Sequence, residues 1–497
     1  MAVRAALGAG RGRLVRQLLA ESLTYAAAGG ILAVLVATLC LRFVRLALPQ
    51  SPWLDEVSLD GTVLAFNLGI AVLTALLIGL LPAVRASRVD VVSGLKTAAG
   101  AGPRGRRLRT TLAVAEVALA LALFAAAGLM LRSFLNLAGS DPGYEPRDVL
   151  TFRLSLPETK YPDGAARRVF FDALRERLSS LGGVSASGLV STLPLDQERM
   201  VTLLDIEGRP RPADRTEMPR ASVRIVSPGF FQAMGIRLVS GRALSEEDRN
   251  GAPRVVVVNE SLARRYFEGE APISARVHRM GEIVGVVDDV RQEGLDRDPE
   301  PEVYFDYRQV PDAMGEAIAR MSVAVRYDAR SSGLVESVKA AVRELDAELP
   351  LADVRTMEAR LEESVARPRL YALLLSFFAG IALVLAVSGV ASVVSYQAAE
   401  RTRENGLRVA LGATPDEIVA LSLKDGWRIL LFGLALGLAG ATFVGRMLSS
   451  VLFQVSPFDP WTLGAVSLLL GAAVLAAAAI PARRAARLDP VTALRYE

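Results

Sequence analysis

The sequence predicts a multi-pass α-helical membrane protein of about six spans with a mixed α/β extracytoplasmic domain inserted between them. Hydrophobic residues make up 52% of the 497 residues, while aromatic residues make up only 6%. Several runs with few or no charges reach the length of about 20 residues that a helix needs to cross a bilayer. A long segment rich in charge and in Gly and Pro, residues 132–369, separates the third of these runs from the fourth.

Each predicted span is a run in which charged residues are rare or absent. The third run is interrupted by Glu116, and an ionisable residue within a span is a functional candidate by default. Because Glu116 follows Arg109 by only two helical turns, we favour an interfacial, snorkelling or helix-pairing residue. The Gly433–Gly437 pair in the fifth run has the GxxxG spacing of close helix packing. The six predicted spans are residues 22–41, 61–84, 110–131, 370–399, 429–445 with flanks, and 460–482.

The inserted segment alternates between strand-like and helix-like patterns. Short β-branched runs predict strands, and apolar residues at helical spacing predict two amphipathic helices. The segment is long enough for one or two subdomains. The strands are predicted at 148–156, 184–189, 255–258, 283–287 and 322–327, and the helices at 164–181 and 332–348.

Two short motifs occur twice in the chain, in the same order and at a similar separation. Residues 4–9 (RAALGA) repeat residues 408–413 (RVALGA), and residues 82–90 (PAVRASRVD) repeat residues 481–489 (PARRAARLD). This pattern indicates an internal duplication. The first copy lacks the span and outer domain that precede the second, so either these elements have been lost or Met1 is not the true start.

The chain is organised around the charged stretch 400–423, which follows the fourth predicted span directly. Gly412 allows a bend, Thr414 suits a helix N-cap, and Pro415 suits the first helical position. Glu417 completes a capping box. The pattern predicts a stiff stalk that ends in a short helix at the membrane surface, a shape suited to receiving a push, although any span can carry a charged interfacial helix.

Composition and motifs exclude several classes of function. The net charge is only +4, and no basic block is interleaved with aromatics, so nucleic acid is not an expected partner. Cys40 and His278 are the single cysteine and histidine, which leaves neither a disulfide nor a multi-His metal site. There is no GxxxxGK[ST] phosphate loop, and the outer segment contains no HExxH or GxSxG. We therefore expect no enzyme activity and no bound cofactor.

Loop charges predict the orientation of the chain in the membrane. Residues 83–109 carry seven basic residues against Asp90, and the tail from Arg483 is also basic. By the positive-inside rule both segments are cytoplasmic, together with both termini and residues 400–428. The segment 132–369 then lies outside the cytoplasm.

These motifs resemble those of the FtsX-like/MacB-like permease family of ABC transporters. The resemblance is carried by residues 400–413 (ERTRENGLRVALGA), by 481–495 (PARRAARLDPVTALR), by 127–133 (AGLMLRS) and by the order of spans. The duplication resembles the acidobacterial-type duplicated permeases, here truncated at the N-terminus. The implied domains are 1–100 (partial FtsX-like permease domain), 109–137 (transmembrane helix), 138–368 (MacB-like periplasmic core) and 369–497 (FtsX-like permease domain).

The resemblance implies a permease subunit of the bacterial inner membrane that transmits the motion of a separate cytoplasmic ATPase to the outer domain, for efflux or extraction of a substrate. ATP would be bound by that ATPase. Further implied partners are membrane lipids and either a second permease copy or a periplasmic protein. A membrane sensor acting through a separate cytoplasmic protein is the alternative. The ATPase-coupling residues would be Arg401, Glu404, Gly406, Arg408, Ala410, Gly412, Ala413, Thr414, Pro415 and Glu417, with Arg4 and Gly8 in the first copy.

Overall fold

The computed structural model describes residues 11–47, 57–86, 103–196, 198–328, 333–401, 404, 407, 408, 411 and 413–486. The chain divides into two compact units. One combines Met1–Leu135 with Pro368–Glu497 and is helical; the other, Asn136–Arg367, is a mixed α/β domain. The prediction of an α/β domain inserted between apolar helices is therefore confirmed.

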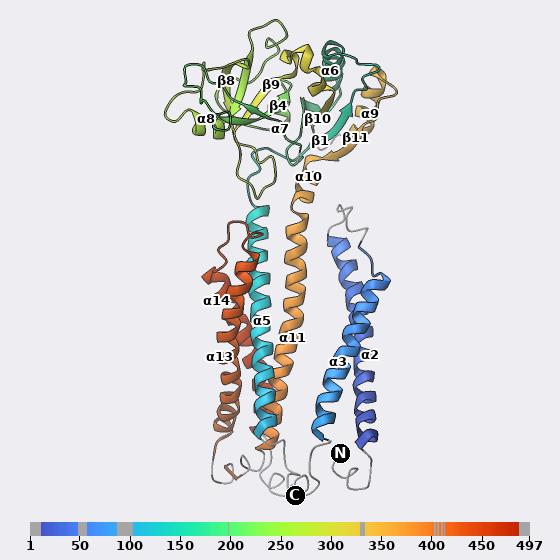
Figure 1. Ribbon diagram of the computed structural model, residues 1–497, viewed down its shortest axis with the longest axis vertical. Coiled ribbons are helices and arrows are strands. Elements are labelled where there is room, and N and C mark those ends of the chain that lie inside the picture. The colour runs from blue at the N-terminus through green and yellow to red at the C-terminus, as the bar shows by residue number, and fades with distance from the viewer. Residues whose placement is uncertain are drawn as a thin grey trace. The chain divides into compact units, whose positions relative to one another are not determined.

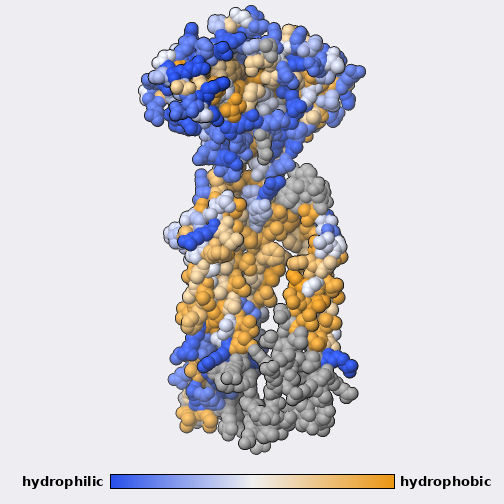
Figure 2. Space-filling view, in the orientation of Figure 1, coloured by the Kyte–Doolittle hydropathy of each residue, from blue (hydrophilic) through white to orange (hydrophobic). Residues whose placement is uncertain are grey.

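Long helices make up the described part of the first unit (Figure 1). Five of them are long and apolar enough to cross a membrane, and the apolar segment of α3 that meets the same test of composition, Gly61–Leu76, is shorter. Every predicted span lies within one helix, and hydrophobic residues dominate their surface (Figure 2). The helices are α2 (Arg11–Ala47), α3 (Gly61–Ala86), α5 (Pro103–Ala138), α11 (Ala366–Glu400), α13 (Pro415–Leu448) and α14 (Pro460–Ala486).

Helices α5, α11, α13 and α14 share one apolar core. Glycine lets α13 approach α5: a Cβ at Gly433 would lie 2.5 Å from Val117 Cγ1, and one at Gly437 would lie 2.8 Å from Leu121 Cβ. The GxxxG pair thus serves close helix packing, as predicted. The core is lined by Ala113, Val117, Ala120, Leu121, Ala386, Val390, Val394, Ile429, Leu430, Leu470, Val474 and Ala478.

Glu116 also lies at a helix contact. A Cβ at Gly389 of α11 would lie 1.8 Å from Glu116 Oε2, so the absence of a side chain at Gly389 makes room for this carboxylate. The position agrees with the helix-pairing interpretation of Glu116.

The connection between α13 and α14 is tied to α5 by polar contacts. Arg132 forms an ion pair with Asp459, which precedes α14. The backbone N–H of Phe453 donates to Ser133 Oγ at 2.8 Å. These contacts hold one end of α5 to the turn between its two neighbours.

Helices α2 and α3 pack against each other. At their contact, Asn67 Nδ2 of α3 donates to the backbone carbonyl of Gly30 in α2 at 3.2 Å. A Cβ at Gly30 would lie 3.7 Å from both Ala71 Cβ and that Asn67 nitrogen, which is ordinary contact.

The α/β domain is built on one mixed sheet with the order β11-β1-β10-β2-β4-β9-β6-β8-β5, in which β3 pairs with β4 and β7 with β8 (Figure 1). The pairs β4–β9 and β6–β8 are parallel, and the other strand pairs are antiparallel. The strands are β1 (Val149–Ser155), β2 (Val184–Val190), β3 (Val201–Leu203), β4 (Arg220–Val226), β5 (Leu238–Gly241), β6 (Val255–Asn259), β7 (Arg276–Val277), β8 (Gly281–Val287), β9 (Glu302–Asp306), β10 (Arg320–Tyr327) and β11 (Ala352–Thr356).

Helices cover both faces of this sheet. On β10, Val323 packs with α6 and α9, whereas Ala324, which points the other way, packs with α7. A third core lies around β6, β8 and α8. The helices are α6 (Gly164–Ser179), α7 (Phe230–Met234), α8 (Glu260–Tyr266), α9 (Leu334–Leu345) and α10 (Met357–Ser364), with 3₁₀ helices η2 (Tyr307–Gln309) and η3 (Asp312–Ile318).

The five predicted strands and both predicted helices of this domain are confirmed, each within a few residues. Strands β4 and β9 were not predicted because their alternation is broken by buried charge. Arg224 of β4 and Glu302 of β9 are both buried and form an ion pair at 3.3 Å. One sheet runs through the whole domain rather than through separate subdomains.

Candidate functional site

The charged stretch after α11 is joined to α13 by an ionic contact. The backbone N–H of Arg401 donates to the carbonyl of Gln397 at 3.1 Å, which continues the last turn of α11. Its guanidinium lies 3.3 Å from Asp425 of α13, and Arg428 lies 3.6 Å from the same carboxylate. Asp425 was not among the predicted site residues, because a carboxylate ten residues beyond the start of a helix gives no sequence signal of its partner.

Two further contacts shape the segment between the helices. Arg408 donates to Glu404 at 2.6 Å, one helical turn apart, and both side chains are about half exposed. The backbone N–H of Ala413 donates to the carbonyl of Arg408 at 2.9 Å and closes the turn before α13. Such an exposed pair contributes little stability, so its charges remain available to a partner.

Helix α13 begins with the predicted capping box. Thr414 is the N-cap and Pro415 the first helical residue. The backbone N–H of Thr414 donates to Glu417 Oε2 at 3.0 Å. Asp416 and Glu417 place negative charge in the first turn, where the helix dipole favours it.

The prediction of a short surface helix is wrong. Helix α13 runs without a break for 34 residues, from Pro415 to Leu448, and includes the fifth predicted span. Gly426 lies within this helix, and a Cβ there would lie 3.2 Å from Ala478 Cβ of α14, so the glycine permits close contact between the two helices. A displacement at Thr414 is therefore applied directly to a membrane helix.

Exposed leucines lie within the charged stretch and were missed by the sequence analysis. Leu407 is 50% exposed and Leu411 is 87% exposed. The N–H of Leu411 donates to the carbonyl of Leu407 at 3.0 Å, so the two side chains are one helical turn apart. The available signal was an apolar i, i+4 pair among charges. We call Leu407 and Leu411 the leucine pair.

The structure places only part of the predicted site. Among the described residues, no group of three or more His, Cys, Asp or Glu could hold a metal ion. The described members of the predicted set are Arg401, Glu404, Arg408, Ala413, Thr414, Pro415 and Glu417. Outside the described residues lie Gly406, Ala410 and Gly412, with Arg4 and Gly8 of the first copy.

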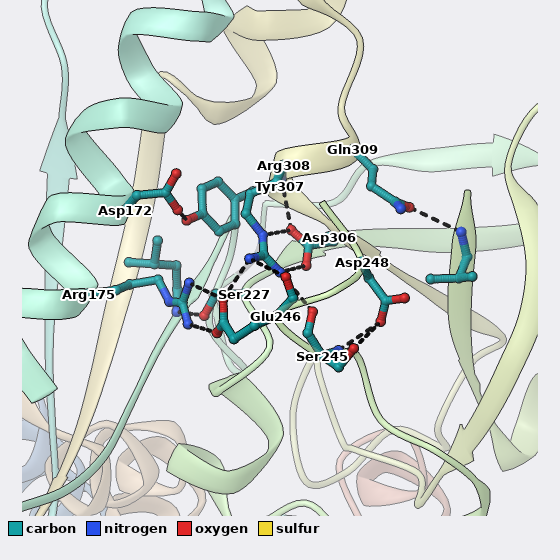
Figure 3. Close-up of polar contacts among 12 residues, drawn as sticks. Asp172, Arg175, Ser227, Ser245, Glu246, Asp248, Asp306, Tyr307, Arg308 and Gln309 are labelled. Atoms are coloured by element: carbon teal, nitrogen blue, oxygen red, sulfur yellow. Dashed lines mark hydrogen bonds and ion pairs between the residues drawn. The ribbon is translucent and has the colours of Figure 1, made fainter. Parts of the chain in front are cut away.

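A second concentration of charge lies in the α/β domain, between α6, the loop before β6 and η2 (Figure 3). Arg308 holds the fully buried Asp306 with two hydrogen bonds, Nε to Oδ1 at 3.0 Å and Nη2 to Oδ2 at 2.7 Å. Arg308 Nη1 also donates to Glu246 at 2.6 Å, and Arg175 of α6 pairs with the same carboxylate. The hydroxyl of Tyr307 donates to Asp172. We call these residues the arginine network.

The electrostatics of the arginine network indicate a structural role. Burial raises the pKa of the Asp306 carboxyl above its usual value, against the opposing effect of Arg308. Burial would also raise the pKa of Glu246, but its contacts with Arg175 and Arg308 outweigh this and lower it. Asp306 and Glu246 are each matched by arginine and Asp172 accepts from Tyr307, so the network joins three elements of the domain.

Apolar helices with an inserted α/β domain define a multi-pass inner-membrane protein of the permease class. The FtsX-like permease C-terminal family matches residues 1–91 and 376–490, and the MacB-like periplasmic core domain matches residues 110–345. Together the two models cover most of the chain, which thus carries an FtsX-like permease domain and a MacB-like periplasmic core domain. The match to 376–490 includes the charged stretch, the capping box and the leucine pair.

Individual relatives agree with this assignment. A probable export ATP-binding/permease protein of Pseudomonas fluorescens is 26% identical over 333 residues, which cover 64% of this chain and 50% of that protein. The ABC transporter permease YknZ of Bacillus subtilis, itself uncharacterized, is 27% identical over 287 residues, which cover 56% of this chain and 70% of YknZ. The chain thus spans about half the length of the first of these relatives.

The α/β domain is also similar to a solved structure. The periplasmic region of MacB from Actinobacillus actinomycetemcomitans matches with a TM-score of 0.30 and 17% identity, covering 44% of this chain and 91% of that structure.

Proposed function

We propose that this chain transmits the ATP-driven motion of a separate cytoplasmic ATPase to its α/β domain, for efflux or extraction of a substrate. The observation that carries the proposal is the composition of the charged stretch within the FtsX-like match. An exposed leucine pair, an exposed Arg408–Glu404 pair and a capped helix start lie within one short segment. A surface of apolar side chains rimmed by charge is typical of a protein contact.

The contact is mechanically connected to the membrane helices. The Arg401–Asp425 ion pair joins the end of α11 to α13, and α13 continues unbroken from its cap into the apolar core. A push on the leucine pair would therefore move two packed helices together. The 497 residues contain no GxxxxGK[ST] phosphate loop, which supports ATP binding by another chain.

The ATPase is the first point to test. A tagged chain, extracted from its native membrane in mild detergent, should co-purify with a polypeptide that contains a phosphate loop. The complex should hydrolyse ATP, and the chain stripped of that partner should not. Hydrolysis by the chain alone, or purification without any such ATPase, would contradict the proposal.

In the proposed orientation both termini and the leucine pair are cytoplasmic, and the α/β domain is outside. Single cysteines at the exposed positions Arg343 and Lys424 test this in a Cys40→Ala background. In spheroplasts an impermeant maleimide should label R343C directly and K424C only after lysis. Labelling of both before lysis would contradict the orientation.

A further inference from the structure

An open cavity of about 690 Å³ lies in the α/β domain beside β3 and β4, between the segment that follows β9 and the turn joining β7 to β8. This volume lies within the range of about 300–1,000 Å³ of small-molecule sites. Apolar side chains form much of its lining: Met200, Val201, Leu203, Met280, Phe305 and Met314.

Some of this apolar lining is exposed. Met200 is 41%, Val201 45% and Met314 55% exposed, although the domain has well-filled cores elsewhere. Methionine side chains are flexible and polarizable, and they adapt to ligands of irregular shape. An exposed apolar lining of this kind is stabilised when an apolar group covers it.

The rim of the cavity carries an excess of positive charge. Arg211, Arg215, Arg254 and Arg279 line it together with a single acid, Asp205. Arg211 forms an ion pair with Asp205 at 3.6 Å. Among the described residues Arg215, Arg254 and Arg279 form no ion pair, in contrast to Arg175 and Arg308 of the arginine network, which both pair with Glu246.

Backbone contacts hold two of these arginines together. Arg254 Nη1 donates to the backbone carbonyl of Arg279 at 3.2 Å. The adjoining backbone N–H of His278 donates to the carbonyl of Asp205 at 2.7 Å, which fixes the β7–β8 turn against the chain after β3. The guanidinium of Arg254 is thereby held at the backbone of Arg279, and both residues line the cavity together with the apolar side chains.

We propose that this cavity binds an amphiphilic anion, a small molecule with a long apolar chain and one carboxylate or similar anionic head group. The chain would cover the exposed methionines and Val201, and the head group would be bound by Arg254 and Arg279. Arginine suits this role because its planar donors match a carboxylate in two-pronged geometry. The site does not depend on the proposed coupling to an ATPase.

Photolabelling of the full chain tests the site. The chain is placed in phosphatidylcholine nanodiscs and irradiated with hexadecanoate that carries a diazirine near the chain end; the labelled peptides are mapped by mass spectrometry. Label on the membrane helices serves as an internal reference. We expect label on the peptides of β3 and of residues 305–314, competed by excess hexadecanoate but not by hexadecyltrimethylammonium.

Charge-reversal variants supply the matched comparison. Arg254→Glu with Arg279→Glu changes two exposed side chains and should lower the label at these peptides by more than about tenfold, because the loss of a single charge-assisted contact already corresponds to about that factor. Arg343→Glu, an exposed arginine of α9 outside the cavity, should leave the label unchanged. Met314→Gln, which keeps the charges, should reduce it as well.

Three results would overturn the proposal. They are the absence of label at these peptides, equal label in the double variant and the wild type, and equal competition by the cationic amphiphile. An intact pattern of limited proteolysis in each variant shows that a loss of label comes from binding and not from unfolding.

Discussion

The two units of this chain place charge differently. In the α/β domain some ion pairs are buried, since Arg308 holds Asp306 and Arg224 holds Glu302 with almost no exposure of the carboxylate, while others such as Arg177–Glu344 lie on the surface. In the described part of the helical unit the ion pairs lie beside helix ends, at Asp459 and Glu404, and at Asp425, ten residues into α13. Glycine and small apolar residues make the close contacts between α5 and α13.

Solvent explains the difference. In water a domain gains stability by burying apolar surface, and a fully paired charge can then be included to fix one arrangement. In a bilayer the lipid is as apolar as the helices, so helices associate through close contact of backbones. Charge is then left for the membrane surface, where a partner protein can reach it.

The largest effect is expected in the arginine network. Arg308→Met leaves Asp306 buried without its partner and should lower the free energy of unfolding of the α/β domain by about 3–5 kcal/mol. Pulse proteolysis of the full chain in nanodiscs, across a urea gradient, measures this. The double variant Arg308→Met with Asp306→Leu should recover most of the loss. A single variant as stable as the wild type would show that the pair is not needed.

In the helical unit we expect the largest loss of stability from a side chain introduced at the close contact between α13 and α5. Gly437→Leu places a side chain where Leu121 already lies and should destabilise the four-helix core by about 1–3 kcal/mol. Gly380→Leu on α11 is the matched control, because a Cβ there meets nothing within 4 Å. Resistance to added SDS in mixed micelles reports the difference. Equal resistance of the two variants would show that the close contact of Gly437 with Leu121 does not stabilise the four-helix core.

Acid should weaken the α/β domain through Asp248. Burial works to raise the pKa of Asp248, but hydrogen bonds from Arg242 and Ser245 outweigh burial and hold it below the usual 3.8. The unfolded chain therefore takes up this proton at higher pH than the folded domain does. The stabilisation is present above about pH 5 and is lost as the pH falls through and below 3.8.

Asp248→Asn tests the direction of this dependence of stability on pH. Between pH 6 and pH 3 the variant should lose less stability than the wild type, as measured by urea-gradient proteolysis with a protease active over that range. A wild type and variant with the same dependence on pH would show that Asp248 contributes nothing to it.

The smallest loss of stability is expected from the removal of helix N-caps. Thr414→Ala with Glu417→Ala removes the cap of α13 at a cost of about 1 kcal/mol, too little to unfold the chain, and should reduce recovery of the ATPase complex. Asp163→Ala removes the cap of α6, whose carboxylate accepts from Ala166 N–H at 2.8 Å, and should affect only the α/β domain. Equal recovery in both variants would mean that the cap of α13 serves the helix alone.

The sequence predicts elements better than it predicts their partners. Apolar runs located each long apolar helix that the structure describes, and Thr414, Pro415 and Glu417 marked the start of α13 correctly, because caps and spans are encoded locally. The continuity of α13 from its cap into the fifth predicted span was not foreseen, because the charged residues up to Arg428 placed this segment at the cytoplasmic surface. The role of Asp425 depends on its ion pair with Arg401, and that of the leucine pair depends on its exposure. Both are properties of the folded chain that the local sequence does not encode.

The leucine pair and its neighbours are the proposed contact with an ATPase. A photoreactive benzoylphenylalanine at Leu411, which is 87% exposed, reads this contact directly in living cells. The control carries the same group at Leu436, which is 59% exposed on the apolar part of α13. We predict a crosslink from position 411, and not from 436, to a polypeptide with a phosphate loop. No adduct from 411, or equal adducts from both positions, would contradict the account.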